Sequence, residues 1–227
     1  MAQVNCGVWI ALERPGDEVC TAGCLVRYKD QPNKIMLLSV CHGLVKSNGK
    51  KGDVVVLGDG SGKRIGLLEN WTTFHSQIQA DAALVWVDPA IIGLALGSLG
   101  APAGVVGNPL LDSDFSICTQ GNVIRHGTVD SYQDVQSSPQ GPGGWTDIDV
   151  LYQQQVICTD QCTVPGDSGA VAIDGNNNVI GMVVAVTDDG NPRTVITPIS
   201  SILQHPDFGR NLEVVLKLPS SPLKPKL

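Results

Sequence analysis

Frequent turn signals divide the chain into about a dozen short apolar segments, and this pattern limits the fold more than any other feature. Its 227 residues, enough for a sizeable core, contain 26 glycines and 14 prolines, which favour turns and interrupt helices, as in 174–176 and 189–192. Only 16% of the residues are charged and 4% are aromatic. The sequence therefore predicts an all-β fold, with strands at 7–12, 23–28, 35–41, 53–57, 64–69, 82–87, 115–119, 122–130, 148–157, 170–173, 179–187 and 193–197.

The run Gly166-Asp167-Ser168-Gly169 is the clearest sign of chemistry in the chain. It predicts a tight turn with the Ser168 hydroxyl at its tip. In such a turn the N–H groups of Gly166 and Ser168 point at one spot, which is the arrangement of an oxyanion hole. A serine is inert at neutral pH unless a base takes its proton and a third group orients that base. The run alone is only suggestive, so a histidine and an acid are also needed.

Of the four histidines, only His42 closes an apolar run, at 35–44. Among the acids, Asp81 leads directly into the buried-type segment 82–87. The remaining histidines stand among polar or turn-forming neighbours, where exposure to solvent is the usual state: His75, His126 and His205. His42 and Asp81 are therefore the predicted partners of Ser168.

These segments resemble the chymotrypsin/trypsin-like serine proteases, the PA clan, and most closely their bacterial members. The similar stretches are Leu38–Leu44, Asp81–Leu84 and Gly166–Gly169, in the family's order of His, Asp and Ser. The resemblance spans roughly residues 6 to 205. It implies two six-stranded antiparallel β-barrels, with the active site in the cleft between them and a short C-terminal helix.

The resemblance also implies a division of the chain. We expect an N-terminal barrel over 1–110 with His42 and Asp81, a C-terminal barrel and helix over 111–210 with Ser168, and a tail over 211–227. Thr197 and Pro198 are a plausible cap and first residue of the helix, which should end before Pro206. The proline-rich end is typical of a disordered tail or a linker.

The mechanism implied by the resemblance is that of a serine endopeptidase working through an acyl-enzyme. Ser168 attacks the peptide carbonyl, His42 takes its proton and later gives it to the leaving amine, and Asp81 orients the imidazole. Gly166 and Ser168 offer their N–H groups to the oxyanion. No cofactor and no metal are expected, and the partner is a polypeptide substrate.

Asp167 needs a cation if it is buried behind the oxyanion loop. The chain begins Met1-Ala2-Gln3-Val4, without the Ile-Val that a cleavage exposes in animal trypsins. Bacterial relatives supply an arginine from the second barrel, and the segment 121–129 is similar to that strand, with Arg125 as the candidate. Two alternatives remain open: Arg125 is a solvated strand residue, or the N-terminal amine or Arg193 supplies the charge.

The substrate pocket implied by the resemblance is uncharged. This disfavours cleavage after Lys or Arg, and the absence of histidine from 183–186 disfavours cleavage after Glu. We expect a small or medium apolar residue, or an uncharged polar one, before the cut bond. The expected pocket residues are Cys162, Thr163, Val184, Ala185, Val186 and Thr194.

Seven cysteines, an odd number, set the chain apart from the secreted members of the family. Gly43 and Val164 stand where those members place disulfide partners. We therefore favour reduced thiols and a cytoplasmic protein. Cys158 and Cys162 have the spacing of half a zinc site, but without a second pair of ligands they are better interpreted as small buried residues.

Charge and hydropathy exclude other classes. The net charge of −7 and the pI near 4.9 disfavour nucleic acid as a partner. The uncharged stretch 89–111 is long enough to span a bilayer, but its five glycines and three prolines argue against a membrane span. Because the given chain has no basic N-terminal region followed by an apolar core, we expect no secretory signal; a secreted protein with its signal removed is the alternative.

Two rival functions remain. One is a catalytically silent double barrel that binds proteins, because Ala170-Val171 replaces the family's Gly-Pro and the usual disulfides are missing. The other is a catalytic or regulatory domain of a larger assembly with a regulatory protein partner, because the end of the chain is proline-rich.

Overall fold

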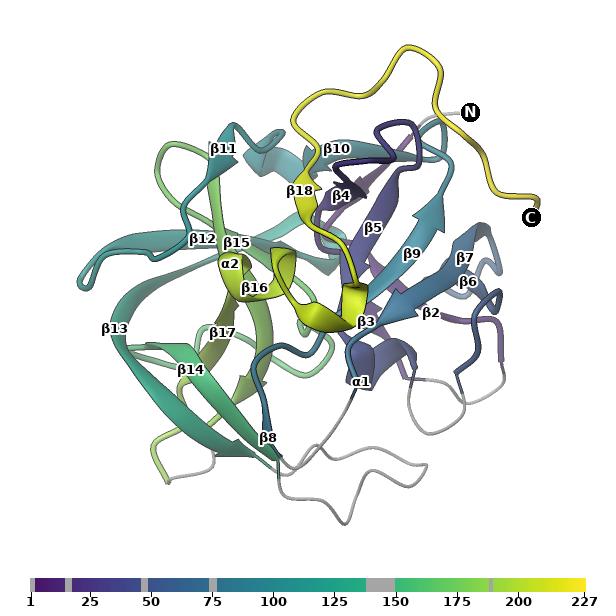
Figure 1. Ribbon diagram of the computed structural model, residues 1–227. Coiled ribbons are helices and arrows are strands. Elements are labelled where there is room, and N and C mark those ends of the chain that lie inside the picture. Colours follow the sequence, from purple (N-terminus) through teal and green to yellow (C-terminus); the bar gives the residue numbers. More distant parts are fainter. Residues whose placement is uncertain (1–2, 15–17, 46–48, 74–76, 138–149, 188–189) are drawn as a thin grey trace.

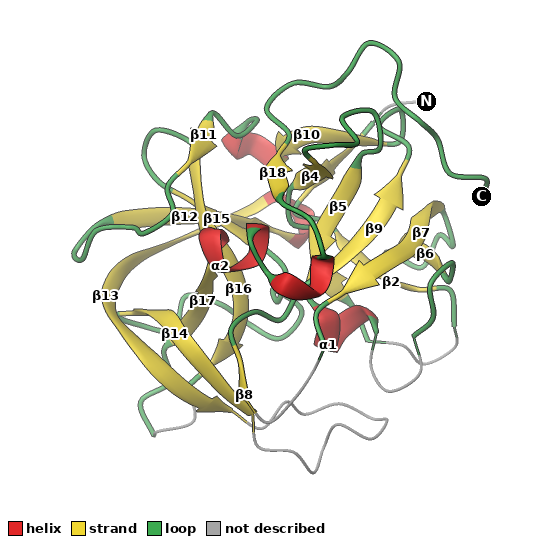
Figure 2. Cartoon of the chain, viewed as in Figure 1, coloured by secondary structure: helices red, strands yellow, loops and turns green. Residues whose placement is uncertain are grey.

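Two curled β-sheets make up most of the molecule (Figure 2). The computed structural model describes residues 3–14, 18–45, 49–73, 77–137, 150–187 and 190–227. Helices are few and short. The prediction of an all-β fold with two barrels and a short C-terminal helix is confirmed.

The N-terminal sheet carries the strands that border His42 and Asp81. It is antiparallel, and β5 pairs with β9 so that Leu38 lies opposite Leu84 and Ser39 opposite Ala83. Its strand order is β18 (Leu212–Val214), β4 (Leu25–Tyr28), β5 (Met36–Ser39), β9 (Ala83–Val87), β7 (Arg64–Trp71), β6 (Val54–Leu57), β2 (Trp9–Leu12) and β3 (Cys20–Thr21).

The C-terminal sheet closes on itself, because β16 pairs with both β15 and β17. A short strand from the other half, β8 (Gln77–Ile78), adds in parallel to β14, so the two barrels are joined by backbone pairing. The strand order is β11 (Gly104–Val105), β16 (Asn178–Val186), β15 (Val171–Ile173), β12 (Asp114–Thr119), β13 (Val123–Ser137), β14 (Val150–Cys158) and β17 (Thr194–Pro198).

The two barrels lie side by side, with the C-terminal helix in front of their junction (Figure 1). The larger apolar core draws residues from both halves, including Leu38 and Leu84 from the first and Val171 and Met182 from the second. A smaller core around Phe115 and Ile196 fills the C-terminal barrel. The shared core therefore fixes the two barrels against each other.

Short helices and connections complete the described chain. The connection between the barrels contains β10, which pairs in parallel with β1, and then β11. Within the described residues, no helix has the length and apolar character needed to cross a bilayer. The remaining elements are β1 (Val4–Cys6), α1 (Cys41–Leu44), β10 (Ile92–Leu96), η1 (Gly97–Leu99), η2 (Gln120–Asn122), α2 (Ile199–Leu203) and η3 (Pro206–Phe208).

The helix α2 lies in the predicted place, but its cap is Pro198 rather than Thr197. The Thr197 hydroxyl donates instead to Gln155 Oε1 at 2.6 Å, so it binds a residue of β14 rather than capping the helix. After α2 the chain returns to the first barrel, where β18 pairs with β4 (Figure 1). The segment expected to be a tail therefore contains a strand of the N-terminal sheet, and beyond it Leu223 N donates to Asn33 O at 2.7 Å.

Candidate active site

Asp81 is a fully buried carboxylate whose two oxygens are both engaged. Its Oδ1 accepts the backbone N–H groups of Cys41 at 2.8 Å and His42 at 3.0 Å. Its Oδ2 contacts His42 Nδ1 and accepts the hydroxyl of Tyr152 at 3.2 Å. Burial of a carboxylate is tolerated when it is paired and hydrogen-bonded in this way.

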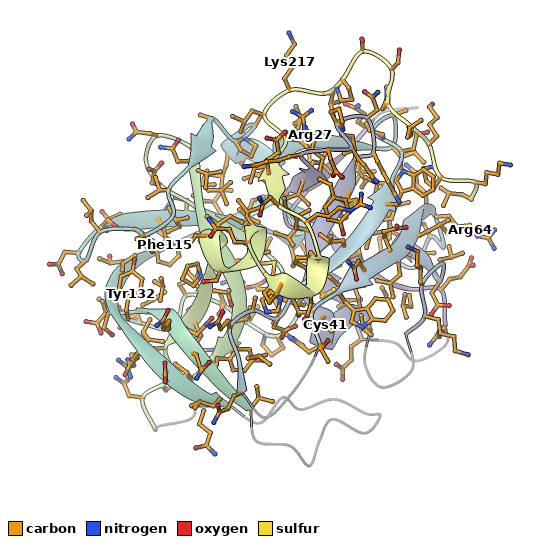
Figure 3. The ribbon with its side chains drawn as sticks, in the orientation of Figure 1. Arg27, Cys41, Arg64, Phe115, Tyr132 and Lys217 are labelled. Atoms are coloured by element: carbon orange, nitrogen blue, oxygen red, sulfur yellow. The ribbon has the colours of Figure 1, made fainter. Side chains whose placement is uncertain are left out.

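Strand pairing explains how Asp81 and His42 meet. Ser39 ends β5 opposite Ala83 of β9, so Asp81 precedes that pair on one strand while His42 follows it on the other. His42 lies on the one-turn helix α1, with its side chain 22% exposed. Cys41, beside His42, lies where the N-terminal barrel faces the C-terminal one (Figure 3). The carboxylate is thus buried while the imidazole keeps access to the surface.

Tyr152 is a member of this group that the sequence analysis missed. It lies on β14 opposite Ile78 of β8, and this parallel pairing brings it to Asp81. Burial, followed by the neighbouring Asp81 charge, raises the pKa of Tyr152 well above its ordinary value. The hydroxyl therefore stays protonated and can donate to the carboxylate.

The turn that carries Ser168 has the backbone expected for a Gly-Asp-Ser-Gly run. Gly166 and Gly169 have φ angles of +95° and +97°, which side-chain-bearing residues rarely adopt. Asp167 Oδ2 accepts the N–H of Val164 at 2.9 Å, which closes the loop on itself. Gly169 N donates to Val183 O at 2.8 Å, and Ser168 is half-buried.

The turn is fixed against the N-terminal barrel beside the strand that leads to His42. Ser168 O accepts the N–H of Thr21 at 2.7 Å, and Thr21 Oγ1 donates to Gly166 O at 2.7 Å. A Cβ on Gly169 would lie 2.6 Å from Ser39 Oγ and would also collide with Thr21 O. Ser39 is the last residue of β5, three positions before His42. The turn is therefore hydrogen-bonded to Thr21 of β3 and lies against the side chain that ends β5.

Arg125 lies next to Asp167. Its Nε is 3.2 Å from Asp167 Oδ2, and the side chains are 32% and 3% exposed. The contact is an ion pair rather than an aligned hydrogen bond. Arg193, the other arginine considered from the sequence, lies 3.6 Å from Asp130 Oδ2.

Two of the residues expected to form the substrate pocket, Cys162 and Thr163, contact Thr194, which is fully buried. Thr194 Oγ1 accepts the N–H of Cys162 at 3.0 Å and lies 3.0 Å from Thr163 Oγ1. Strand β16 brings Val186 opposite Thr194. Ala185 lies opposite Val195, whereas Val184 is buried at a register shift between β16 and β17.

The remaining residues considered from the sequence are the other three histidines and the seven cysteines. His126 is exposed and contacts Ser116 Oγ at 2.9 Å, His205 lies 3.9 Å from Asp207, and His75 lies outside the described residues. The seven cysteines all lie in the described residues, and none of them is in a disulfide bond. In the described part of the chain, no group of three or more His, Cys, Asp or Glu side chains is arranged to hold a metal ion.

Comparisons with known proteins identify the fold. No protein-family model matches the sequence, and no curated protein matches it. Among solved structures, Thermobifida fusca protease A shares 20% identity at a TM-score of 0.64, and the alignment covers 94% of this chain and 100% of that one. Cellulomonas bogoriensis chymotrypsin shares 19% identity at a TM-score of 0.63, covering 95% and 100%. Nocardiopsis protease shares 19% identity at a TM-score of 0.64, covering 94% and 99%.

The resemblance predicted from the sequence is thus confirmed for the fold: the chain has the two-barrel fold of bacterial chymotrypsin-like serine proteases. The alignment extends over nearly the whole length of this chain and of each of these three structures. At about 20% identity the likeness concerns the architecture alone, so the chemistry must be argued from the residues of this chain.

Proposed function

We propose that the protein is a serine endopeptidase in which Ser168 is the nucleophile, His42 the general base and Asp81 the group that orients the imidazole. Ser168 attacks the carbonyl of a peptide bond while His42 Nε2 takes the hydroxyl proton, and His42 then passes that proton to the leaving amine. Water releases the acyl group in a second round of the same proton transfers.

The contact between His42 Nδ1 and the buried Asp81 carboxylate carries this proposal. An imidazole whose Nδ1–H donates to a carboxylate exposes Nε2 as the proton acceptor. The carboxylate is held by the N–H groups of Cys41 and His42 as well as by Tyr152, so the ring is oriented by a rigid group. A buried carboxylate also stabilises the imidazolium that forms during the reaction.

The oxyanion of the tetrahedral intermediate is bound by the N–H groups of Gly166 and Ser168. The positive φ of Gly166, which glycine adopts at little cost, supports a turn of this kind. Each such donor contributes on the order of 3 kcal/mol in the transition state. The ion pair between Asp167 and Arg125 stabilises the turn. In animal trypsins the aspartate next to the serine pairs instead with the N-terminal ammonium that cleavage exposes.

The substrate residue before the cut bond is small or medium-sized and uncharged. We assign the binding of this residue to Cys162, Thr163 and Thr194, which are in contact with one another, together with Val184, Ala185 and Val186 of β16. One structure with this fold, 18% identical, is described as a glutamic-acid-specific serine protease that uses a histidine triad in substrate binding. The wall Val184–Val186 has no histidine, which argues against that specificity here.

Labelling with a fluorophosphonate, which phosphonylates activated serines, tests the proposal. The wild type should be labelled once, at Ser168, and Ser168→Ala should abolish the label and lower peptide turnover by on the order of 10⁶. Ser116→Ala is the matched control, because Ser116 is also a serine in contact with a histidine, His126 at 2.9 Å. The control should keep label and activity. Absence of labelling in a folded protein that still binds peptides would instead identify a silent binding module.

A further inference from the structure

Thr21 is a fully buried residue of β3 whose polar groups are all engaged beside the Ser168 turn. Its N–H donates to Ser168 O and its hydroxyl donates to Gly166 O, both at 2.7 Å. Its carbonyl accepts the hydroxyl of Ser39 at 2.7 Å. Any residue except proline could make the two backbone contacts, whereas the contact with Gly166 O depends on the threonine side chain.

The backbone N–H groups of residues 164–170 fall into two sets. Within the described residues, those of Gly166 and Ser168 donate to no other group. The others donate over distances of 2.8 to 3.0 Å, and they belong to Val164, Asp167, Gly169 and Ala170. The two N–H groups that the proposed function assigns to the oxyanion are therefore the two that remain available to a ligand.

The peptide plane between Gly166 and Asp167 lies between these two donors in the chain. A peptide unit is planar and rigid, so holding both its C=O and its N–H fixes its orientation. Here Gly166 O accepts the Thr21 hydroxyl, and Asp167 N donates to Val164 O at 3.0 Å. Because the orientation of this plane sets the directions of the N–H groups on both sides of it, the Thr21 hydroxyl acts on both oxyanion donors.

Gly166 depends on such outside contacts. It has a φ of +95° and no side chain, so its own conformational preference does little to hold the plane. The indole of Trp9 packs against it, since a Cβ added to Gly166 would lie 3.2 Å from Trp9 Nε1. Trp9 pairs with Thr21 between β2 and β3, and its N–H donates to Gln120 Oε1 of the C-terminal barrel at 2.7 Å. The edge of the N-terminal sheet thus contacts Gly166 through two paired side chains.

We propose that Thr21 is a positioning residue of the peptidase, whose hydroxyl holds the Gly166–Asp167 peptide so that the flanking N–H groups bind the oxyanion. This inference rests on the proposed function and extends the site to β3 of the other barrel. Thr21 acts through Gly166 and takes no part in the proton transfers. Because the oxyanion exists only after attack on the carbonyl, loss of the hydroxyl should affect kcat rather than KM.

Substitutions that remove or keep the hydroxyl test the proposal. Thr21→Val and Thr21→Ala remove it, and Thr21→Ser keeps it. With a peptide amide as substrate, kcat per active site should fall roughly tenfold in the first two while KM changes less than about twofold, because Gly166 O loses its hydrogen bond. Thr21→Ser should behave like the wild type. Active sites are counted with the fluorophosphonate label, so unfolded protein does not enter the rate.

Ser200→Ala is the matched control. The Ser200 hydroxyl also donates to the carbonyl of a glycine, Gly107 at 2.9 Å, but this contact joins α2 to the connection between the barrels. The control should keep the wild-type kcat. If valine at position 21 distorts the packing, the comparison of Thr21→Ala with Thr21→Ser still isolates the hydroxyl, because alanine and serine differ only in that group.

Inhibition by a peptide trifluoromethyl ketone is a second measurement, and a general loss of stability would not change it. The ketone adds to Ser168 as an ionised hemiketal and so places an oxyanion next to the two donors. In Thr21→Val its inhibition constant should rise by about the same factor as kcat falls.

Three results would overturn the proposal: a variant without the hydroxyl that keeps the kcat of Thr21→Ser, a change confined to KM, or a loss of kcat with unchanged inhibition by the ketone. A wild type that is neither labelled at Ser168 nor able to hydrolyse peptides would overturn the proposed function and this inference with it. The wild type alone therefore distinguishes the two failures.

Discussion

Replacing Arg125 with methionine removes the cation beside Asp167 and keeps most of the volume of the side chain. Asp167 is 3% exposed and then retains the Val164 N–H as its described hydrogen bond. Breaking a buried ion pair from one side costs about 3–5 kcal/mol. Since Arg125 is 32% exposed, water screens part of the interaction, and we expect Arg125→Met to lower the free energy of unfolding by about 2–3 kcal/mol.

The double-mutant cycle with Asp167→Asn separates the pair from other effects. Asp167→Asn removes the buried charge and leaves Arg125 free to turn to solvent, so it should cost about 1 kcal/mol. In the double variant no uncompensated carboxylate remains. Its loss should therefore be close to that of Asp167→Asn alone, with a coupling energy of about 2–3 kcal/mol between the two positions.

Urea unfolding followed by tryptophan fluorescence measures these differences, in a Ser168→Ala background that prevents self-cleavage. Trp9 is a suitable reporter because its indole lies against the Cα of Gly166, where an added Cβ would be 3.2 Å from Trp9 Nε1. In the peptidase itself, Arg125→Met should reduce kcat more than it raises KM, because the oxyanion donors loosen. The reasoning is refuted if Arg125→Met shifts stability by less than about 0.5 kcal/mol and adds independently to Asp167→Asn, which is the behaviour of a solvated strand residue.

Three further substitutions test the site. Tyr152→Phe should lower kcat roughly tenfold or more with little change in KM, because a hydrogen bond to a charged partner contributes about 1.5–3 kcal/mol and the ring is otherwise conserved. An unchanged kcat would contradict a positioning role. Asp81→Asn should lower kcat on the order of 10⁴-fold without unfolding the protein, measured by peptide hydrolysis and circular dichroism. Gly169→Ala should destabilise the fold by roughly 2 kcal/mol or more in thermal unfolding, because a Cβ there meets Ser39 Oγ at 2.6 Å, whereas the control Gly175→Ala has open space.

The longer strands could be predicted from the sequence because each is an apolar run bounded by turn residues. All of the predicted segments overlap strands of the structure. The missed strands have two to five residues, and most of them pair with strands distant in sequence. The two-residue strand β8 is defined by its pairing with β14, and the three-residue strand β18 by its pairing with β4. Local patterns carry no information about such pairings.

The same limit applies to the site. Gly166–Gly169, His42 and Asp81 could be named because each has a local signature. Tyr152 could not, since nothing near it in the chain indicates that the β8–β14 pairing brings its hydroxyl to Asp81. For Arg125 the sequence left a paired and a solvated interpretation equally open, and only the three-dimensional arrangement gives the 3.2 Å approach to Asp167. Contacts between side chains that are distant in sequence depend on packing rather than on local spacing.

The pH dependence of Ser168 acylation tests most directly the claim that His42 activates this serine. The acylation rate, followed with a chromogenic peptide ester from about pH 5 to 9, should rise through a single group that titrates near neutrality, as histidine does. His42→Ala should lose both the rate and this dependence. A wild-type profile that stays flat over that range, or a His42→Ala protein that still acylates Ser168 at the wild-type rate, would contradict the account.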